Sequence, residues 1–257
     1  MYIYASDEPL QTKFDDLQLI FHLRDIEFGE TVEKIEYDTT MLVSTKEPLY
    51  LHLHLMKAGI HPDPTISPFD PLNGIYKRFP LLKMMKRPPK KVNLLEKGAP
   101  LSSEKSDSND LVPYWYPDVT VNLVNFQDVL DVGELPPFTR KFIYADRIRK
   151  QYYPIIYFNE FWELKKKRIP ILDEKDRELP IKISFSTTSM LFFRLMTQFD
   201  FFIKQQESIY GEHNEFESIK RMFLETSPWL IALTFFVSLL HSIFDFLAFK
   251  NGIYNLI

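Results

Sequence analysis

The amino-acid sequence predicts a mainly β extramembrane domain with an antiparallel, sandwich-like architecture, followed by two C-terminal helices and one transmembrane helix. Three observations lead to this fold class. Several short segments alternate between apolar and polar residues, one long run near the C-terminal end is almost free of charge, and none of the 257 residues is a cysteine. The chain is long enough to bury a sizeable core, so the domain does not need disulfides to fold.

The predicted strands lie in residues 1–61 and 114–187, which we expect to be the two parts of the β-rich domain. Around residue 50, Leu51, Leu53 and Leu55 alternate with more polar side chains, a two-residue period that is typical of a half-buried strand. His52 and His54 would then lie on the wetter face. Similar segments are residues 1–4, 17–23, 34–37, 119–124 and 179–185. Turns rich in Pro and Asp separate them, which favours an antiparallel sandwich.

Residues 62–113 separate the two parts and predict a long, irregular, flexible loop. Lys and Arg cluster over residues 77–91, and residues 102–109 are Ser-rich and of low complexity. A basic run beside Pro88 and Pro89 indicates a solvated loop, and contact with anionic lipid headgroups is the alternative.

Two helices are expected in a connector over residues 188–226. The first covers about 188–210, with Thr187 or Thr188 as its N-cap, and the second about 215–225. The first carries a broad apolar face, formed by Leu191, Phe192, Leu195, Met196, Phe199, Phe202 and Ile203. We expect this face either to pack on the sheet or to lie on a membrane surface.

The run over residues 228–249 predicts a membrane-spanning helix, and residues 250–257 form a short tail. Its 22 residues contain one formal charge, and a helix of that length, roughly 33 Å, can cross a bilayer core. Pro228 suits a first helical turn, Trp229 lies where an interfacial aromatic residue is expected, and Lys250 ends the run. A buried helix of a soluble protein is the alternative.

The polar residues of this helix form one stripe, because they recur at three- and four-residue steps. They are Thr234, Ser238, His241, Ser242 and Asp245. A carboxylate at mid-span costs roughly 2.5–3.5 kcal/mol on insertion scales, so the stripe needs protein, water or a headgroup beside it. The functional interpretation is one wall of a hydrophilic lipid path, and the structural one is an interface between helices.

Composition excludes several kinds of site. Without cysteine there are no disulfides, Cys-ligated zinc sites or catalytic thiols. The seven glycines stand singly, which excludes glycine-rich nucleotide loops and the hydrolase elbow. The net charge of −4 gives no bulk attraction to nucleic acid. We therefore expect no enzyme, no cofactor and no nucleic-acid partner.

One cluster raises the question of a metal. His52 and His54 are two residues apart on a strand and could chelate zinc, with His61 or Asp63 completing the site. The alternative is a polar sheet face with His61 in a Pro-fixed turn. Since neither cysteine nor an H-E-x-x-H motif is present, we expect no metal and keep His52, His61 and Asp63 as weak candidates.

Four segments resemble the cleft lip and palate transmembrane protein family. They read YLHLHLMKAGIHPDP (50–64), WYPDVTVNLV (115–124), YYPIIYFNEFW (152–162) and LETSPWLIALTFFVSLLHSIFDFLAFKN (224–251). The last is the most specific, because His241, Asp245, Phe246, Leu247, Phe249, Lys250 and Asn251 fall where the family places them. The family pattern has His52 and His61 but accepts Tyr in place of His54, which further weakens the zinc alternative.

The resemblance implies a multi-pass protein of the endoplasmic reticulum membrane with a luminal β-rich domain. One branch of the family resembles scramblases that move glucosaminyl-phosphatidylinositol for GPI-anchor synthesis. The other is associated with retaining receptor subunits and controlling their trafficking. Residues 152–162 look like the trafficking branch, whereas residues 244–251 lean to the scramblase branch, so both remain open. The implied partners are membrane lipids and other transmembrane helices or client membrane proteins.

The two ends of the chain depart from the family pattern. The first eight residues lack the basic and apolar regions of a signal peptide, and the chain ends eight residues after Phe249, where the family continues into further spanning helices. Taken literally, this describes a tail-anchored protein. We expect instead a part, or a short form, of a longer protein.

Overall fold

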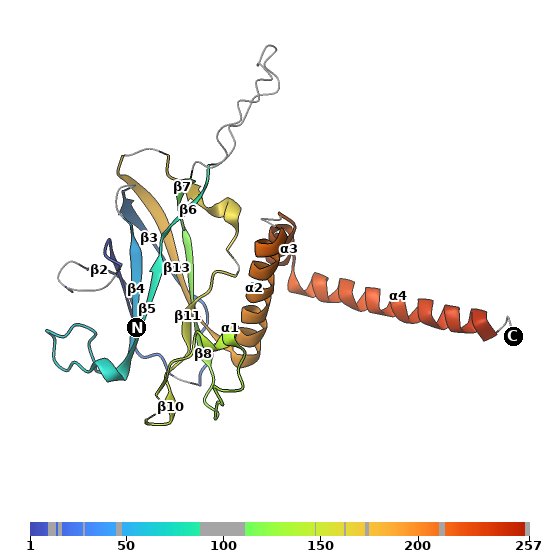
Figure 1. Cartoon of the computed structure of the whole chain (residues 1–257), viewed down its shortest axis with the longest axis horizontal. Coiled ribbons are helices and arrows are strands. Elements are labelled where there is room, and N and C mark those ends of the chain that lie inside the picture. The colour runs from blue at the N-terminus through green and yellow to red at the C-terminus, as the bar shows by residue number, and fades with distance from the viewer. Residues whose placement is uncertain are drawn as a thin grey trace, which may run out of the picture. The chain divides into compact units, whose positions relative to one another are not determined.

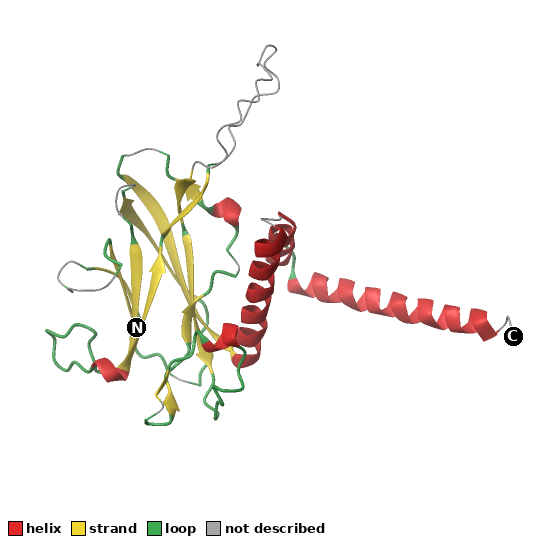
Figure 2. Ribbon diagram, in the orientation of Figure 1, coloured by secondary structure: helices red, strands yellow, loops and turns green. Residues whose placement is uncertain are grey.

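The structure is a computed structural model that describes residues 1–9, 14, 17–27, 29–44, 48–87, 111–146, 148–161, 163–172, 175–210 and 214–254 (Figure 1). The chain divides into two compact units, Met1–Phe202 and Ile203–Ile257, which are described separately. Strands are the main secondary structure of the first unit, and helices are that of the second (Figure 2).

The first large sheet has the strand order β2-β1-β4-β5, and all of its neighbouring strands are antiparallel. Its strands are β1 (Tyr2–Ser6), β2 (Gln18–His22), β4 (Tyr50–Met56) and β5 (Gly74–Pro80). Strand β4 is central, and its alternating leucines face the core, as the two-residue period predicts.

The second large sheet has the order β11-β8-β13-β3. Its strands are β3 (Ile35–Val43), β8 (Asp118–Asn125), β11 (Ile156–Phe158) and β13 (Arg177–Ser189). Strand β13 pairs antiparallel with β3 but parallel with β8. This sheet is therefore mixed, whereas a purely antiparallel one was expected. The parallel pairing is possible because a long chain segment connects β8 to β13.

The first unit also contains two small sheets and short helices. The sheet β12-β7-β6 joins β6 (Leu82–Lys86), β7 (Leu111–Trp115) and β12 (Ile169–Pro170). Strands β9 (Ala145–Asp146) and β10 (Gln151–Tyr152) form a separate pair. The helix α1 (Pro137–Arg140) is short, and two 3₁₀ turns cover Pro71–Asn73 and Lys165–Lys167.

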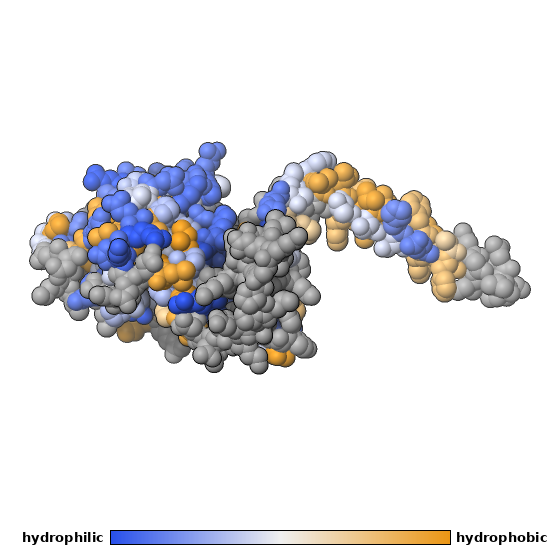
Figure 3. All heavy atoms as spheres, turned by 90° about the horizontal axis from the view of Figure 1, so that it is seen from above, coloured by the Kyte–Doolittle hydropathy of each residue, from blue (hydrophilic) through white to orange (hydrophobic). Residues whose placement is uncertain are grey.

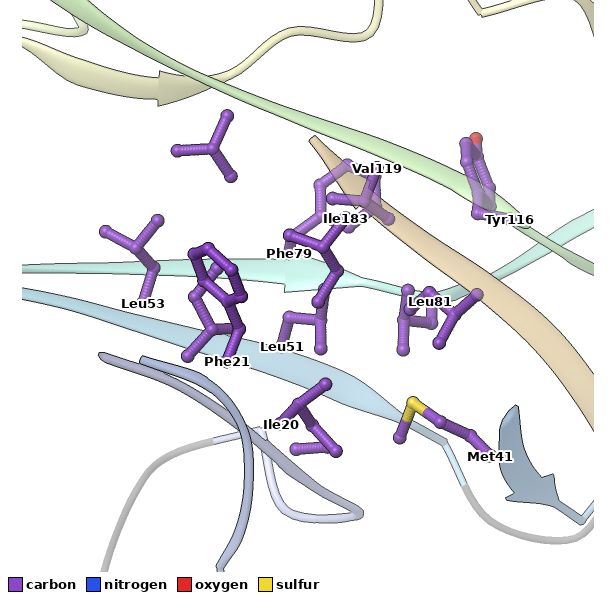
Figure 4. Close-up of a cluster of buried hydrophobic side chains, with 14 of the residues drawn as sticks. Ile20, Phe21, Met41, Leu51, Leu53, Phe79, Leu81, Tyr116, Val119 and Ile183 are labelled. Atoms are coloured by element: carbon purple, nitrogen blue, oxygen red, sulfur yellow. The ribbon is translucent and has the colours of Figure 1, made fainter. Parts of the chain in front are cut away.

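The main core lies between the two large sheets. Figure 4 shows Leu51, Leu53 and Phe79 from the first sheet beside Val119 and Ile183 from the second. All five side chains are buried, and burial of each large aliphatic or aromatic side chain stabilises a fold by about 1.5–3 kcal/mol. This two-layer packing confirms the predicted mainly β, sandwich-like domain.

Three helices follow the last strand: α2 (Met190–Tyr210), α3 (Asn214–Glu225) and α4 (Pro228–Tyr254). The N-cap of α2 differs from the prediction, because Ser189 Oγ accepts a hydrogen bond from the backbone N–H of Phe192 at 3.2 Å. Thr187 instead belongs to β13, and its Oγ1 accepts from the backbone N–H of Val32.

The prediction of an irregular stretch is wrong for residues 74–80, 82–86 and 111–113, which form β5, β6 and the start of β7. Ile75 and Phe79 are buried in the core, but the Lys and Arg residues around them obscured the alternation. The Ser-rich segment 102–109 lies outside the described residues.

Candidate functional site

The membrane-spanning helix α4 is the first candidate. Within it, Leu233–Lys250 is long and apolar enough to cross a bilayer, and none of these 18 residues is buried within the structure. The core helix of a soluble protein would be mostly buried. Over the part of the chain that the structure describes, this is the single helix that meets these criteria.

Pale and blue groups interrupt the orange, apolar surface of α4 in Figure 3. At 100° per residue, the predicted polar stripe occupies an arc of about 100° on the helix. The large side chains Phe235, Phe244 and Phe246 lie outside this arc and are exposed. The helix thus has one polar side and a broad apolar side.

Three hydroxyl groups of the stripe bond to the backbone of the helix itself. Thr234 Oγ1 donates to the carbonyl oxygen of Leu230 at 2.8 Å, and Ser238 Oγ donates to that of Thr234 at 2.9 Å. Ser242 Oγ donates to the carbonyl oxygen of Ser238 at 3.0 Å. This i−4 bonding satisfies the hydroxyl hydrogens within the helix and lowers their cost in a membrane.

His241 and Asp245 are different. Both are exposed on α4, and the described residues offer neither of them a hydrogen bond or an ion pair. They are one helical turn apart, so they lie next to each other on the stripe. These two side chains are therefore the groups of α4 that require a polar partner within a bilayer.

The predicted histidine face of β4 is buried rather than wet. His52 is fully inaccessible, and its Nε2 and Nδ1 lie 2.9 Å from Ser6 Oγ and 2.7 Å from Tyr76 Oη. Burial lowers the pKa of His52 from its usual value, and it lowers the pKa of His54 to about 4. Both imidazoles are thus neutral at pH 7, and both nitrogens of His52 are occupied by hydroxyl groups.

The other two metal candidates lie in the turn after β4. His61 Nδ1 accepts from the backbone N–H of Asp63 at 3.1 Å, and Asp63 Oδ1 accepts from the backbone N–H and the hydroxyl of Thr65. No group of three or more potential metal ligands occurs in the described ranges. His52, His61 and Asp63 are not brought together as one ligand set.

A groove of about 790 Å³ lies at one end of the first sheet, and sequence reasoning did not anticipate it. The ring of Tyr2 stacks on that of His22, with centroids 4.2 Å apart, and meets the ring of His61 edge-on at 5.1 Å. These residues are far apart in the sequence. The β1–β2 register pairs Tyr2 with His22, and the β1–β4 pairing brings the turn that carries His61 close to them.

The described part of the aromatic segment, residues 152–161, is largely built into the domain. The hydroxyl of Tyr152 donates to the carbonyl oxygens of Phe126 and Asp128 at 3.3 and 2.9 Å, and Tyr153 Oη donates to that of Leu72 at 3.0 Å. Tyr157 is buried. These contacts fix the three rings within the domain, and Tyr152 and Tyr153 also line the groove.

The family model described as Cleft lip and palate transmembrane protein 1 (CLPTM1) matches residues 1–255. Putative lipid scramblase CLPTM1 of Danio rerio is 30% identical over 98% of this chain and 44% of its own length. CLPTM1-like membrane protein cnrB of Dictyostelium discoideum is 29% identical over 86% of this chain and 36% of its own. Lipid scramblase CLPTM1L of Bos taurus is 25% identical over 98% of this chain and 47% of its own. The chain spans less than half the length of these relatives, and no solved structure matches it.

Proposed function

Since this chain belongs to the Cleft lip and palate transmembrane protein 1 family, we propose that it forms part of a lipid scramblase in which α4 is one wall of the headgroup path. It is a membrane protein whose relatives include lipid scramblases, which are transporters rather than conventional enzymes. A single helix cannot enclose a path. The other walls must come from further helices, in the same polypeptide or in a partner.

The observation that carries this proposal is the polar stripe on an otherwise apolar spanning helix. A lipid headgroup resists entry into the bilayer core because it loses its hydrogen bonds with water. A line of polar groups along the membrane normal can replace those bonds step by step. His241 and Asp245 have no polar partner among the described residues, so they are available to a headgroup.

The chemistry of the stripe favours a headgroup rich in hydrogen-bond donors. Thr234, Ser238 and Ser242 donate their hydrogens to backbone carbonyls, which leaves their oxygen lone pairs as acceptors. The carboxylate of Asp245 is also an acceptor. Sugar hydroxyls and an ammonium group are the complementary donors.

Glucosaminyl-phosphatidylinositol carries both kinds of donor, and we propose it as the transported lipid. This assignment rests on the family resemblance and on the acceptor chemistry of the stripe. The accompanying proposal is that the protein resides in the endoplasmic reticulum membrane, with its β-rich domain in the lumen and a role in GPI-anchor synthesis.

A chimera tests the proposal. Residues 1–255 replace the matching part of the Danio rerio relative, and the purified chimera is reconstituted in liposomes that contain fluorescent phosphatidylcholine or fluorescent glucosaminyl-phosphatidylinositol. The fraction of label that dithionite bleaches measures scrambling. We expect Asp245→Leu and His241→Leu to abolish transport, whereas Phe244→Leu, outside the stripe, retains it. Wild-type scrambling by the Asp245→Leu chimera would contradict the proposal.

A binding module that retains receptor subunits and controls their trafficking is the second candidate. It is favoured by the four-residue spacing of Thr234, Ser238 and Ser242, because small hydroxyl residues at this spacing allow close packing between helices. This function predicts that Ser238→Leu disrupts capture of client membrane proteins while scrambling is untouched. If the β-rich domain holds the clients, capture instead survives deletion of residues 228–257.

A further inference from the structure

The helix α2 has two apolar sides, and only one of them packs on the domain. Phe193 is fully buried, with ring centroids 5.1 Å from Tyr157 and 5.9 Å from Phe142. Thr197 is also buried and lies 3.3 Å from Thr139 of α1, oxygen to oxygen. The contacts through Phe193 and Thr197 fix which side of α2 faces the sheet.

The opposite side of α2 is apolar and exposed. Its residues, which we call the α2 outer stripe, are Leu191, Phe192, Leu195 and Phe199. Their side chains are 70%, 40%, 42% and 52% exposed, respectively. At 100° per residue, they fall within an arc of about 100°, roughly opposite Phe193 and Thr197. The sequence had left open whether this face packs on the sheet, and the structure shows that it does not.

We propose that the α2 outer stripe docks the β-rich domain onto the surface of the lipid bilayer. The stripe contains no charged residue, and the exposed Arg194 flanks it. A helix with an apolar, Phe-containing face and a cation at its border is the kind that lies in a membrane interface, where the long side chain of Arg reaches the headgroups. The inference is independent of lipid transport.

Chain connectivity favours the bilayer over a second copy as the occupant. Residues 211–227 are the only link between α2 and the membrane-spanning helix α4. Even when fully extended, these 17 residues reach at most about 60 Å. The span therefore holds the stripe at a high effective concentration next to the lipid surface, whereas a second copy must be found by diffusion.

The absence of cysteine from the sequence makes a direct test possible. Single cysteines are introduced into the full chain by Leu195→Cys or Phe199→Cys in the stripe and by Gln205→Cys, an exposed polar position outside the arc of the stripe. Phe244→Cys on α4 calibrates a residue in contact with lipid. Each variant is labelled with an environment-sensitive fluorophore and reconstituted in phosphatidylcholine vesicles. Because the replaced side chains are exposed, their loss leaves the fold intact.

We expect lipids that carry a nitroxide near the headgroup to quench the label at positions 195 and 199. Aqueous iodide should quench the label at these two positions several-fold less than it quenches the label at position 205. Equal access of iodide to positions 195, 199 and 205, without lipid quenching, would overturn the proposal. Protection from iodide without quenching by lipid would also overturn it, because it would mean that a second protein surface covers the stripe.

Discussion

The guanidinium of Arg168 and the carboxylate of Glu163 form a buried, two-point ion pair. Arg168 Nε lies 3.0 Å from Glu163 Oε1 and Nη2 lies 3.3 Å from Oε2, and the two side chains are only 9% and 6% exposed. The guanidinium also stacks over the ring of Tyr116, 4.5 Å from its centroid. Both residues of the pair lie in the segment between β11 and β12, and the contact of Arg168 with Tyr116 joins this segment to the main core.

Removal of one partner of this pair should destabilise the domain strongly. Glu163→Ala leaves the Arg168 charge buried without its counter-ion, so we expect a loss of about 3–5 kcal/mol in the free energy of unfolding. Urea titration of the protein in detergent measures it. Asp118→Asn, which breaks the exposed pair with Lys167, is the matched control and should change little. A loss for Glu163→Ala no larger than that of the control would rule out a structural role for the pair.

Tyr157→Phe should stabilise the protein. The Tyr157 hydroxyl is buried without a hydrogen-bond partner in the described part of the chain, and an unsatisfied buried polar group costs about 1–3 kcal/mol. The matched control is Tyr152→Phe, which removes a hydroxyl that donates to two carbonyl oxygens and should destabilise by about 1 kcal/mol. Thermal unfolding of both variants gives the signs, and a lower melting temperature for Tyr157→Phe would refute the expectation.

Stability should fall with acidification between pH 6.5 and about 4. Burial, followed by the charges of His52 and His61, lowers the pKa of His54 to about 4, and burial also lowers that of His52. The unfolded chain therefore takes up protons near pH 6.5 that the folded domain refuses. Each such histidine removes up to about 1.4 kcal/mol of stability per pH unit in this window.

The variant His54→Asn isolates this effect. We expect its unfolding free energy to depend less steeply on pH between 6.5 and 4 than that of the parent chain. Above pH 7 the two profiles should run parallel, since the imidazole of His54 is then neutral in the folded and unfolded states alike. Parallel acid profiles for the two proteins would show that His54 does not control the transition.

Local patterns of apolar and polar residues correctly predicted the elements in which one pattern continues from end to end. Strand β4 and helix α4 follow from the alternation of Leu51, Leu53 and Leu55 and from one long apolar run. The fully buried side chain of His52 could not be foreseen in this way, because its partners Ser6 and Tyr76 come from neighbouring strands whose register the sequence does not reveal. For the same reason, the groove around Tyr2 and His22 was missed.

Periodicity also could not decide which apolar side of α2 faces the domain. Phe192 and Phe193 are consecutive and chemically identical, yet one is exposed and the other is fully buried. That choice depends on Phe142, Tyr157 and α1, which form the surface on which α2 packs. Likewise, the polar stripe on α4 was read from spacing, whereas the i−4 bonding of its hydroxyls became evident only in the structure.

The different hydrogen bonding of the stripe residues predicts how each affects membrane insertion. Ser238 already donates to its own helix, so Ser238→Ala should alter insertion of α4 only slightly. Asp245 has no such bond among the described residues, and Asp245→Leu should favour insertion by about 1–3 kcal/mol, less than the full mid-span cost because it lies toward the end of the span. Glycosylation mapping of residues 228–254 as a test segment in microsomes measures both. Equal insertion of Asp245→Leu and the parent segment would contradict the expectation, because it would mean that the carboxylate already reaches water or headgroups in the parent helix.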